Sequence, residues 1–249
     1  MKKNSNHILF IITIVTLAFP VDKKCNICYH SINNDYLKDL WGNIYHPEHK
    51  KDAQFCESCY RIISVAITDG GYIMPDERLI CKLCYSSSII DRKQADSNIM
   101  FVSDFLSENG IKINNNIYNI NLIYKNEIKF NNDNSMHYKG FTILESKNKS
   151  QVSNIFILKG MPEQEFNAIL GHELMHIWIS NNNLDIDEDL EEYYCNLVSK
   201  NIYKLDNSQF SNVKIEGINK VLNGNNARHL FNETDYNISQ IIKHIYNNQ

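Results

Sequence analysis

The clearest pattern of apolar positions in the chain predicts a long helix in its second half. Between residues 162 and 180, apolar side chains recur three and four positions apart, as they do on one face of a helix. They are Phe166, Ile169, Leu170, Leu174 and Ile177. Pro162 suits the first turn of a helix, and the asparagines at 181–183 suit its end. We therefore expect a helix from about Pro162 to Ser180.

Two more helices are predicted downstream. One should begin near Asp187 or Glu188, where acidic side chains favour the positive end of the helix dipole, and its apolar face would carry Leu190, Tyr194, Leu197, Val198 and Ile202. The other fits "YNISQIIKHIYNN" at 236–248. The segment 206–232 between them shows no clear period.

Upstream of the long helix, three segments indicate strands. Residues 116–124 alternate between apolar and polar positions, and "GFTILES" (140–146) and "SNIFILKG" (153–160) are rich in strand-forming residues. The polar segment "SSSIIDRKQADSN" (86–98) is predicted to be a linker. Strands followed by helices indicate an α+β fold.

The first twenty residues resemble a secretory signal peptide. Lys2 and Lys3 precede an apolar run from Ile8 to Phe19, which is short for a membrane span but typical of a signal-peptide core. Residues 1–20 are thus predicted to direct export to a periplasm or the exterior, leaving no stable membrane span after their removal. The alternative is a β-branched strand of the mature fold, in which case the protein would be cytoplasmic.

Composition limits the remaining possibilities. A chain of 249 residues, 43% of them hydrophobic, allows one ordinary domain with a small module. The net charge of −4 provides no basic field that would attract nucleic acid.

Six of the seven cysteines form three C-x2-C pairs, a spacing that brings two thiolates to one tetrahedral metal ion. Two closed zinc sites need eight ligands, and His46 and His49 supply the missing pair. The predicted first site is Cys25, Cys28, His46 and His49. The predicted second site is Cys56, Cys59, Cys81 and Cys84. The alternative is a disulfide framework of a secreted binding protein.

This pattern resembles a LIM domain, a double zinc-ribbon module, which we assign to residues 22–86. "LWGNIYHPEH" (40–49) looks like the LIM stretch in which an aromatic residue precedes the histidine ligand. The chain departs from the usual pattern in the six residues between His49 and Cys56. The resemblance implies two structural zinc ions and a module that docks on another protein or on its own chain.

The predicted long helix carries a second candidate metal site in "ILGHELMHIW" (169–178). His172 and His176 lie one helical turn apart on the same face, so that both imidazoles can reach one zinc ion. Glu173 is placed to act as general base on a water molecule that attacks a carbonyl group. The alternative is a buried helix that carries two hydrogen-bonded histidines.

A third ligand is expected from the following helix, where "DEDLEEYYCNLV" offers Glu191 and Glu192. Helical phase places Glu191 nearer the apolar face. The segment also resembles the thermolysin-like zinc peptidases, the gluzincins, in which a polar residue lies four positions after the ligand glutamate. Glu192 with Asn196 matches that spacing, and the resemblance therefore favours Glu192 as ligand and Asn196 as its supporting partner. Cys195 is interpreted as a packing residue.

The whole arrangement resembles the plant growth-limiting LIM peptidases of the DA-one family and their bacterial relatives. The stretches that carry the resemblance are "GMPEQEFNAILGHELMHIWI" (160–179), "EEYYCNLVSKNIY" (191–203) and "YNISQIIKHIY" (236–246). Tyr193 stands where the family usually has glycine. The resemblance implies a small gluzincin-type domain at 98–249, with a short sheet and the histidine-bearing helix.

Function follows as an expectation from this resemblance. It implies a zinc-dependent peptidase that cleaves protein or peptide substrates, with one catalytic and two structural Zn²⁺ ions. The alternative is a non-catalytic zinc-binding interaction module on a peptidase-like scaffold. The group that stabilises the oxyanion stays open among His229, Tyr193 and Tyr236.

Overall fold

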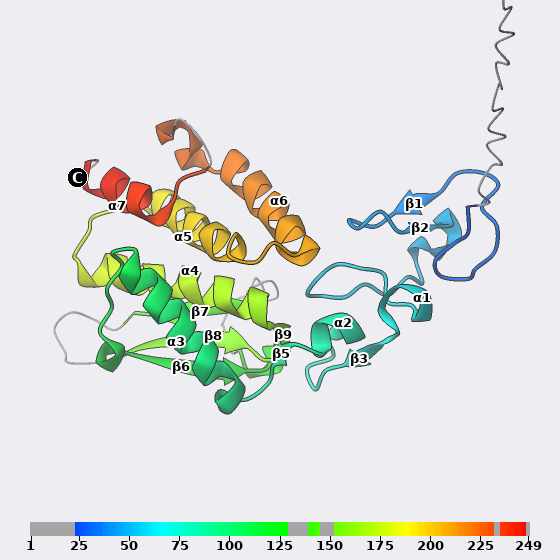
Figure 1. Cartoon of the computed structure of the whole chain (residues 1–249), viewed down its shortest axis with the longest axis horizontal. Helices are drawn as coiled ribbons and strands as arrows, with labels where there is room; N and C mark the ends of the chain where they lie inside the picture. Colours follow the sequence, from blue (N-terminus) through cyan, green and yellow to red (C-terminus); the bar gives the residue numbers. More distant parts are fainter. Residues whose placement is uncertain (1–22, 129–138, 145–151, 232–234, 248–249) are drawn as a thin grey trace, which may run out of the picture.

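A computed structural model describes residues 23–128, 139–144, 152–231 and 235–247 of the chain (Figure 1). The segment predicted to be a signal peptide, residues 1–20, lies outside the described residues. Within the described part, no helix is both long enough and apolar enough to cross a bilayer. The chain combines helices and small sheets, which confirms the α+β prediction.

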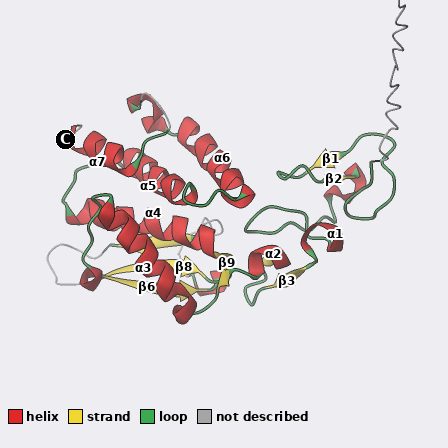
Figure 2. Cartoon of the chain, viewed as in Figure 1, coloured by secondary structure: helices red, strands yellow, loops and turns green. Residues whose placement is uncertain are grey.

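The N-terminal module (residues 23–86) consists of short elements (Figures 1 and 2). They surround two groups of cysteine and histidine side chains. Two antiparallel hairpins form it, and β1 pairs with β2 and β3 with β4. The elements are β1 (Leu37–Lys38), β2 (Ile44–Tyr45), the 3-10 helix η1 (Pro47–Lys50), α1 (Val65–Thr68), β3 (Gly71–Ile73), β4 (Leu79–Cys81) and α2 (Lys82–Tyr85).

The C-terminal part (residues 87–247) contains a three-stranded sheet in the order β6-β8-β7. β6 runs parallel to β8, and β7 runs antiparallel to it. The strands are β5 (Ser88–Ile89), β6 (Tyr118–Ile123), β7 (Gly140–Ile143), β8 (Ser153–Leu158) and β9 (Met161–Pro162), with 3-10 turns η2 (Asn115–Ile117) and η3 (Lys125–Glu127). The three predicted strands are confirmed, and residues 145–146 of the second prediction lie outside the described residues.

Five helices complete the described C-terminal part. They are α3 (Arg92–Glu108), α4 (Glu163–Asn181), α5 (Glu188–Tyr203), α6 (Gln209–Gly224) and α7 (Ile238–Asn247), with the 3-10 helix η5 (Asn226–Leu230) between the last two. The helix predicted at 162–180, the one predicted to begin near Asp187 or Glu188, and the one predicted within 236–248 are thereby confirmed, and residue 248 lies outside the described residues. Asp187 caps the start of α5, because its side chain accepts a hydrogen bond from the backbone N–H of Leu190 (3.0 Å).

Helix α4 lies at the centre of this part, between the sheet and the layer of α5, α6 and α7 (Figure 1). It packs against α3, α5, β7 and β8, and most of its side chains are buried. A helix surrounded in this way is apolar on nearly every side. Gly171 permits the close crossing with α5, since a Cβ atom there would collide with Ile202 and meet Val198 at 3.4 Å.

The prediction of a linker at 86–98 is wrong. Ser88 and Ile89 form β5, which pairs antiparallel with β9, and Arg92 begins the 17-residue helix α3. Asp91 accepts a hydrogen bond from the backbone N–H of Gln94, whose side chain bonds back to the cap, so the start of α3 is a capping box. Most polar side chains of the segment face solvent, but Ser88 and Asn98 are buried, as are Ala95, Val102 and Leu106 of α3.

Candidate metal centres and active site

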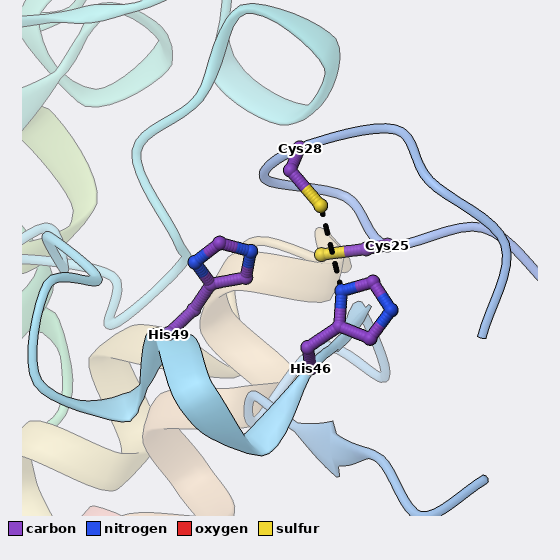
Figure 3. Close-up of side chains that lie close together, drawn as sticks. All are labelled: Cys25, Cys28, His46 and His49. Carbon is purple, nitrogen blue, oxygen red and sulfur yellow. Dashed lines mark hydrogen bonds between the residues drawn. The ribbon is translucent and has the colours of Figure 1, made fainter. Parts of the chain in front are cut away.

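The first cysteine and histidine group of the N-terminal module converges on one point (Figure 3). Cys25, Cys28, His46 and His49 each offer a ligand atom, and these atoms all lie within 4.8 Å of one another. The Sγ atom of Cys28 and Nδ1 of His46 are 3.4 Å apart. A tetrahedral zinc ion with the usual bond lengths separates a sulfur and a nitrogen ligand by about 3.5 Å. The donor set therefore fits a zinc ion, although six residues separate His49 from Cys56.

The second group, Cys56, Cys59, Cys81 and Cys84, is fully buried, and its sulfur atoms lie equally close together. The Sγ atoms of Cys59 and Cys81 are 3.7 Å apart, where two sulfur ligands of a tetrahedral zinc ion are about 3.8 Å apart. Backbone N–H groups of Cys59 and Cys81 donate to Sγ of Cys56 at 3.5 and 3.3 Å. Such bonds favour the thiolate form that binds metal.

All seven cysteines lie in the described residues, and none forms a disulfide. The separation of 3.7 Å between Cys59 and Cys81 is far from the bond length of about 2.05 Å of a disulfide. The arrangement therefore favours metal ligation over the disulfide framework.

The third group lies on α4 and α5. The Nε2 atoms of His172 and His176 are each 3.4 Å from a carboxylate oxygen of Glu192. Nitrogen and oxygen ligands of a tetrahedral zinc ion are separated by about 3.4 Å. The three side chains therefore fit a zinc ion, and all three line the same cleft.

Glu191 contacts the other side of the same cluster. The Nδ1–H group of His176 donates to Oε1 of Glu191 at 2.6 Å, which fixes the ring with Nε2 directed to Glu192. The side chain of Asn196, expected to support the site, donates to the backbone carbonyl of Glu192 (2.8 Å) and lines the cleft. The contact that orients a histidine ring thus comes from Glu191, which the helical phase had placed near the apolar face.

Cys195 also approaches the histidines, with Sγ within 4.8 Å of one nitrogen atom of each. It is fully buried among the core side chains, and burial raises the pKa of its thiol to about 12. Glu192 lines the cleft and Cys195 does not. The described residues thus bring two alternative third groups to the histidines, Glu192 from the cleft and Cys195 from the core.

Glu173 lies beside this cluster with its carboxylate held from β7. The hydroxyl of Thr142 donates to Oε2 of Glu173 at 2.8 Å. Burial raises the pKa of Glu173, while the neighbouring His172 and His176 oppose the rise. Gly140 lets β7 come this close, because a Cβ atom there would meet Ile169 at 2.5 Å and Glu173 at 3.1 Å. No pattern in the sequence pointed to Thr142, since only the folded sheet brings it to α4.

The cleft has a volume of about 580 Å³ and is walled by α4, α5, α6, β7 and one residue of the N-terminal module, Tyr60. None of the three candidates for the oxyanion partner lines it. Tyr193 is buried and stacks on Phe231, with ring centroids 4.0 Å apart. A tyrosine in place of the usual glycine therefore leaves the cleft open.

A sequence model of the family described as "DA1-like: Protein DA1" matches residues 117–246, which is more than half of the chain. The chain belongs to the DA1-like family. The match includes α4, α5 and the three side chains that converge on the cleft. It begins after the N-terminal module and α3.

Two curated relatives support the DA1-like assignment. The chain is 24% identical over 219 residues to "Protein DA1-related 2" and 22% identical over 220 residues to "Protein DA1", both of Arabidopsis thaliana. Each match covers 71% of this chain and 41% of the relative, so the chain spans less than half the length of these relatives. No solved structure matches the chain.

The contacts of the third group predict different effects for its two glutamates. Glu192→Gln should strip the metal from α4 and α5, because an anionic ligand is lost. Glu191→Gln should keep the ion and weaken its binding about 10- to 100-fold, as expected when a partner that orients a ligand is removed. Zinc content and competition with a chelator measure both effects. Metal loss from Glu191→Gln alone would reverse the two roles.

Proposed function

We propose that the protein is a zinc-dependent peptidase that hydrolyses peptide bonds in protein substrates. The observation that carries this proposal is the convergence of His172, His176 and Glu192 at an open cleft, with Glu173 beside them. The resemblance to the DA-one peptidases implies the same activity. Two structural zinc ions would be held by the two groups of the N-terminal module.

Each side chain of the site has a role in this proposal. His172, His176 and Glu192 would hold the zinc ion, which when bound supplies Lewis acidity to a water molecule and to the substrate carbonyl. Glu173 takes a proton from the attacking water and then gives it to the leaving amine, acting first as general base and then as general acid. Thr142 holds one oxygen of Glu173, so that the other can reach the water. Glu191 orients His176.

The cleft also suits an extended peptide. Among the described strands, β7 is at the edge of its sheet, and three of its residues line the cleft next to α4. A substrate strand can add to such an edge through backbone hydrogen bonds, which recognise peptide and not a particular side chain. This property supports proteins or peptides as the substrate class.

The test is removal and return of the metal on the purified full chain. We expect three zinc ions per chain and cleavage of an unstructured protein such as casein. Treatment with a chelator should abolish cleavage, and added Zn²⁺ should restore it in proportion to the ion rebound by α4 and α5. Two zinc ions without cleavage would favour the non-catalytic scaffold, and cleavage that survives loss of all zinc would overturn the proposal.

A further inference from the structure

A buried carboxylate lies at the end of the cleft remote from the histidines. Glu165, in the first turn of α4, is only 2% exposed. Its Oε1 atom accepts hydrogen bonds from the ammonium groups of Lys139 (2.7 Å) and Lys214, and its Oε2 atom accepts one from the hydroxyl of Ser58. Three distant segments therefore meet at this carboxylate: β7 with its preceding residue, α6 and the N-terminal module.

The charges in this cluster do not balance. Lys139 and Lys214 bring two positive charges, and Glu165 brings one negative charge. Within the described residues, both lysines form their ion pairs with Glu165. One positive charge is therefore left over beside the cleft, where all three side chains are part of the wall. A partly buried excess charge favours a ligand of opposite sign.

The two lysines also have more N–H donors than the acceptors that they contact. A lysine ammonium group has three N–H donors. Lys139 uses one on Glu165 and one on the carbonyl of Glu57 (2.9 Å), and Lys214 uses one on Glu165 and one on the carbonyl of Ser58 (2.5 Å). One donor remains on each ammonium group.

The aromatic ring of Tyr60 lies against both ammonium groups. The Nζ atoms of Lys139 and Lys214 are 5.4 and 4.9 Å from its ring centroid. A ring face holds a cation weakly compared with an oxyanion. The N-terminal module thus supplies one wall of this pocket, and a carboxylate with two oxygen atoms matches the two remaining donors.

We propose that Lys139, Lys214 and Tyr60 form a subsite that binds a carboxylate group of the peptide substrate. This proposal rests on the proposed function and specifies its substrates. Glu165 and His172 are seven residues apart on α4, a separation of about 10 Å along the helix axis. An extended peptide covers that distance in about three residues. The preferred substrates therefore carry Asp, Glu or a free C-terminal carboxylate about three residues from the bond that is cleaved.

The test measures binding separately from cleavage. The protein is the full chain with Glu173→Gln, loaded with zinc, so that bound peptides stay intact. The probes are dye-labelled octapeptides of alanine and glycine with an amidated C-terminus, in which one glutamate moves along the sequence. Each has a glutamine counterpart, and a third series has no acidic side chain but a free C-terminus. Affinities are measured by fluorescence anisotropy.

We expect at least one glutamate peptide to bind about tenfold more tightly than its glutamine counterpart, which corresponds to one charge-assisted hydrogen bond. Lys214→Gln should remove this preference, because glutamine can still donate to Glu165 and Ser58 but carries no charge. Lys220→Gln, an exposed lysine on the same helix, should keep it. A preference confined to the free C-terminus would identify the chain end as the carboxylate.

Equal binding of the glutamate and glutamine peptides, with no tighter binding of the series that has a free C-terminus, would overturn the subsite, and so would no binding of any series. A preference that persists in Lys214→Gln would do the same. Because the binding measurement needs no turnover, glutamate-peptide binding by Glu173→Gln together with no cleavage by the wild type would contradict the proposed peptidase function and leave the carboxylate subsite standing. Casein cleavage without any acidic preference would leave the peptidase standing and remove the subsite.

The same cluster predicts the response of stability to acid. Burial raises the pKa of Glu165, but Lys139 and Lys214 outweigh it and bring that pKa down to about 2 from the ordinary 4.5. A carboxyl group whose pKa is lowered by folding stabilises the fold above its unfolded pKa, and this stability is lost as the pH falls towards the folded pKa.

Denaturant unfolding of wild type and Glu165→Gln between pH 7 and 3 measures the contribution of the Glu165 carboxylate to the free energy of unfolding. The wild type should be the more stable protein at pH 7, and the difference should shrink below about pH 4.5. Metal release in acid affects both proteins and cancels in the difference. A difference that stays constant down to pH 3 would show that Glu165 is not ion-paired in the native state.

Discussion

Glu173→Gln should abolish cleavage of casein while three zinc ions stay bound. Glutamine has nearly the same shape and can still contact Thr142, but it cannot take a proton from the attacking water. General base catalysis contributes about 10²–10⁴-fold to rates. The same residue also returns the proton to the leaving amine, so we expect a loss at the upper end of this range. Zinc analysis and initial cleavage rates of the two proteins provide the measurement.

Glu163→Gln is the matched control, since Glu163 is an exposed glutamate in the first turn of the same helix. It should cleave at the wild-type rate. Clear cleavage by the wild type that survives in Glu173→Gln would defeat the assigned mechanism. Loss of zinc in Glu173→Gln would instead make Glu173 a ligand.

Cys81→Ser should unfold the N-terminal module around the second cysteine group and lower the zinc content from three ions to two. Structural zinc contributes about 10–16 kcal/mol of apparent binding free energy in small zinc modules, which is more than such a module gains from its core. Cleavage should fall as well, because the segment between Cys56 and Cys59 holds Ser58 against Glu165 and Tyr60 follows it in the cleft wall.

Lys82→Ser changes the neighbouring exposed residue and should leave zinc content and cleavage unaltered. Zinc analysis, hydrogen exchange of residues 55–85 and cleavage rates compare the three proteins. Unchanged zinc content in Cys81→Ser would contradict the second site. Loss of zinc with full cleavage would show that the cleft does not need the module.

The sequence predicted the elements whose pattern is local. Residues close together in the sequence determine the apolar period of α4, the acidic start of α5 and the alternation of the three strands. The spacing of the cysteine pairs is local in the same way. The helix α3 was missed because its first residues are polar on the solvent side, although Asp91 and Gln94 already carry its capping signal. Helix α6 was not predicted, and only Ser211 and Leu222 among its side chains are fully buried.

The site was predicted as far as it depends on helical spacing. His172 and His176 lie one turn apart on a single helix, and Glu173 directly follows His172. The relative positions of these three side chains therefore follow from the sequence. The contacts of Glu191 with His176, of Thr142 with Glu173 and of Tyr60 with the cleft join residues 15 to more than 100 positions apart in the chain. No local pattern encodes such contacts, because they depend on how the elements pack.

The pairing of β5 with β9 means that the region recognised by family comparison is smaller than the region that folds. The match begins at residue 117, after β5 and α3. Yet β5 pairs with the strand that leads directly into α4, and α3 packs against α4 with Ala95, Val102 and Leu106 buried. A fragment cut at the family boundary would expose that face of α4 to water. A fragment that keeps this face of α4 covered must therefore begin before β5 at Ser88, and family boundaries make poor guides for dissecting this chain.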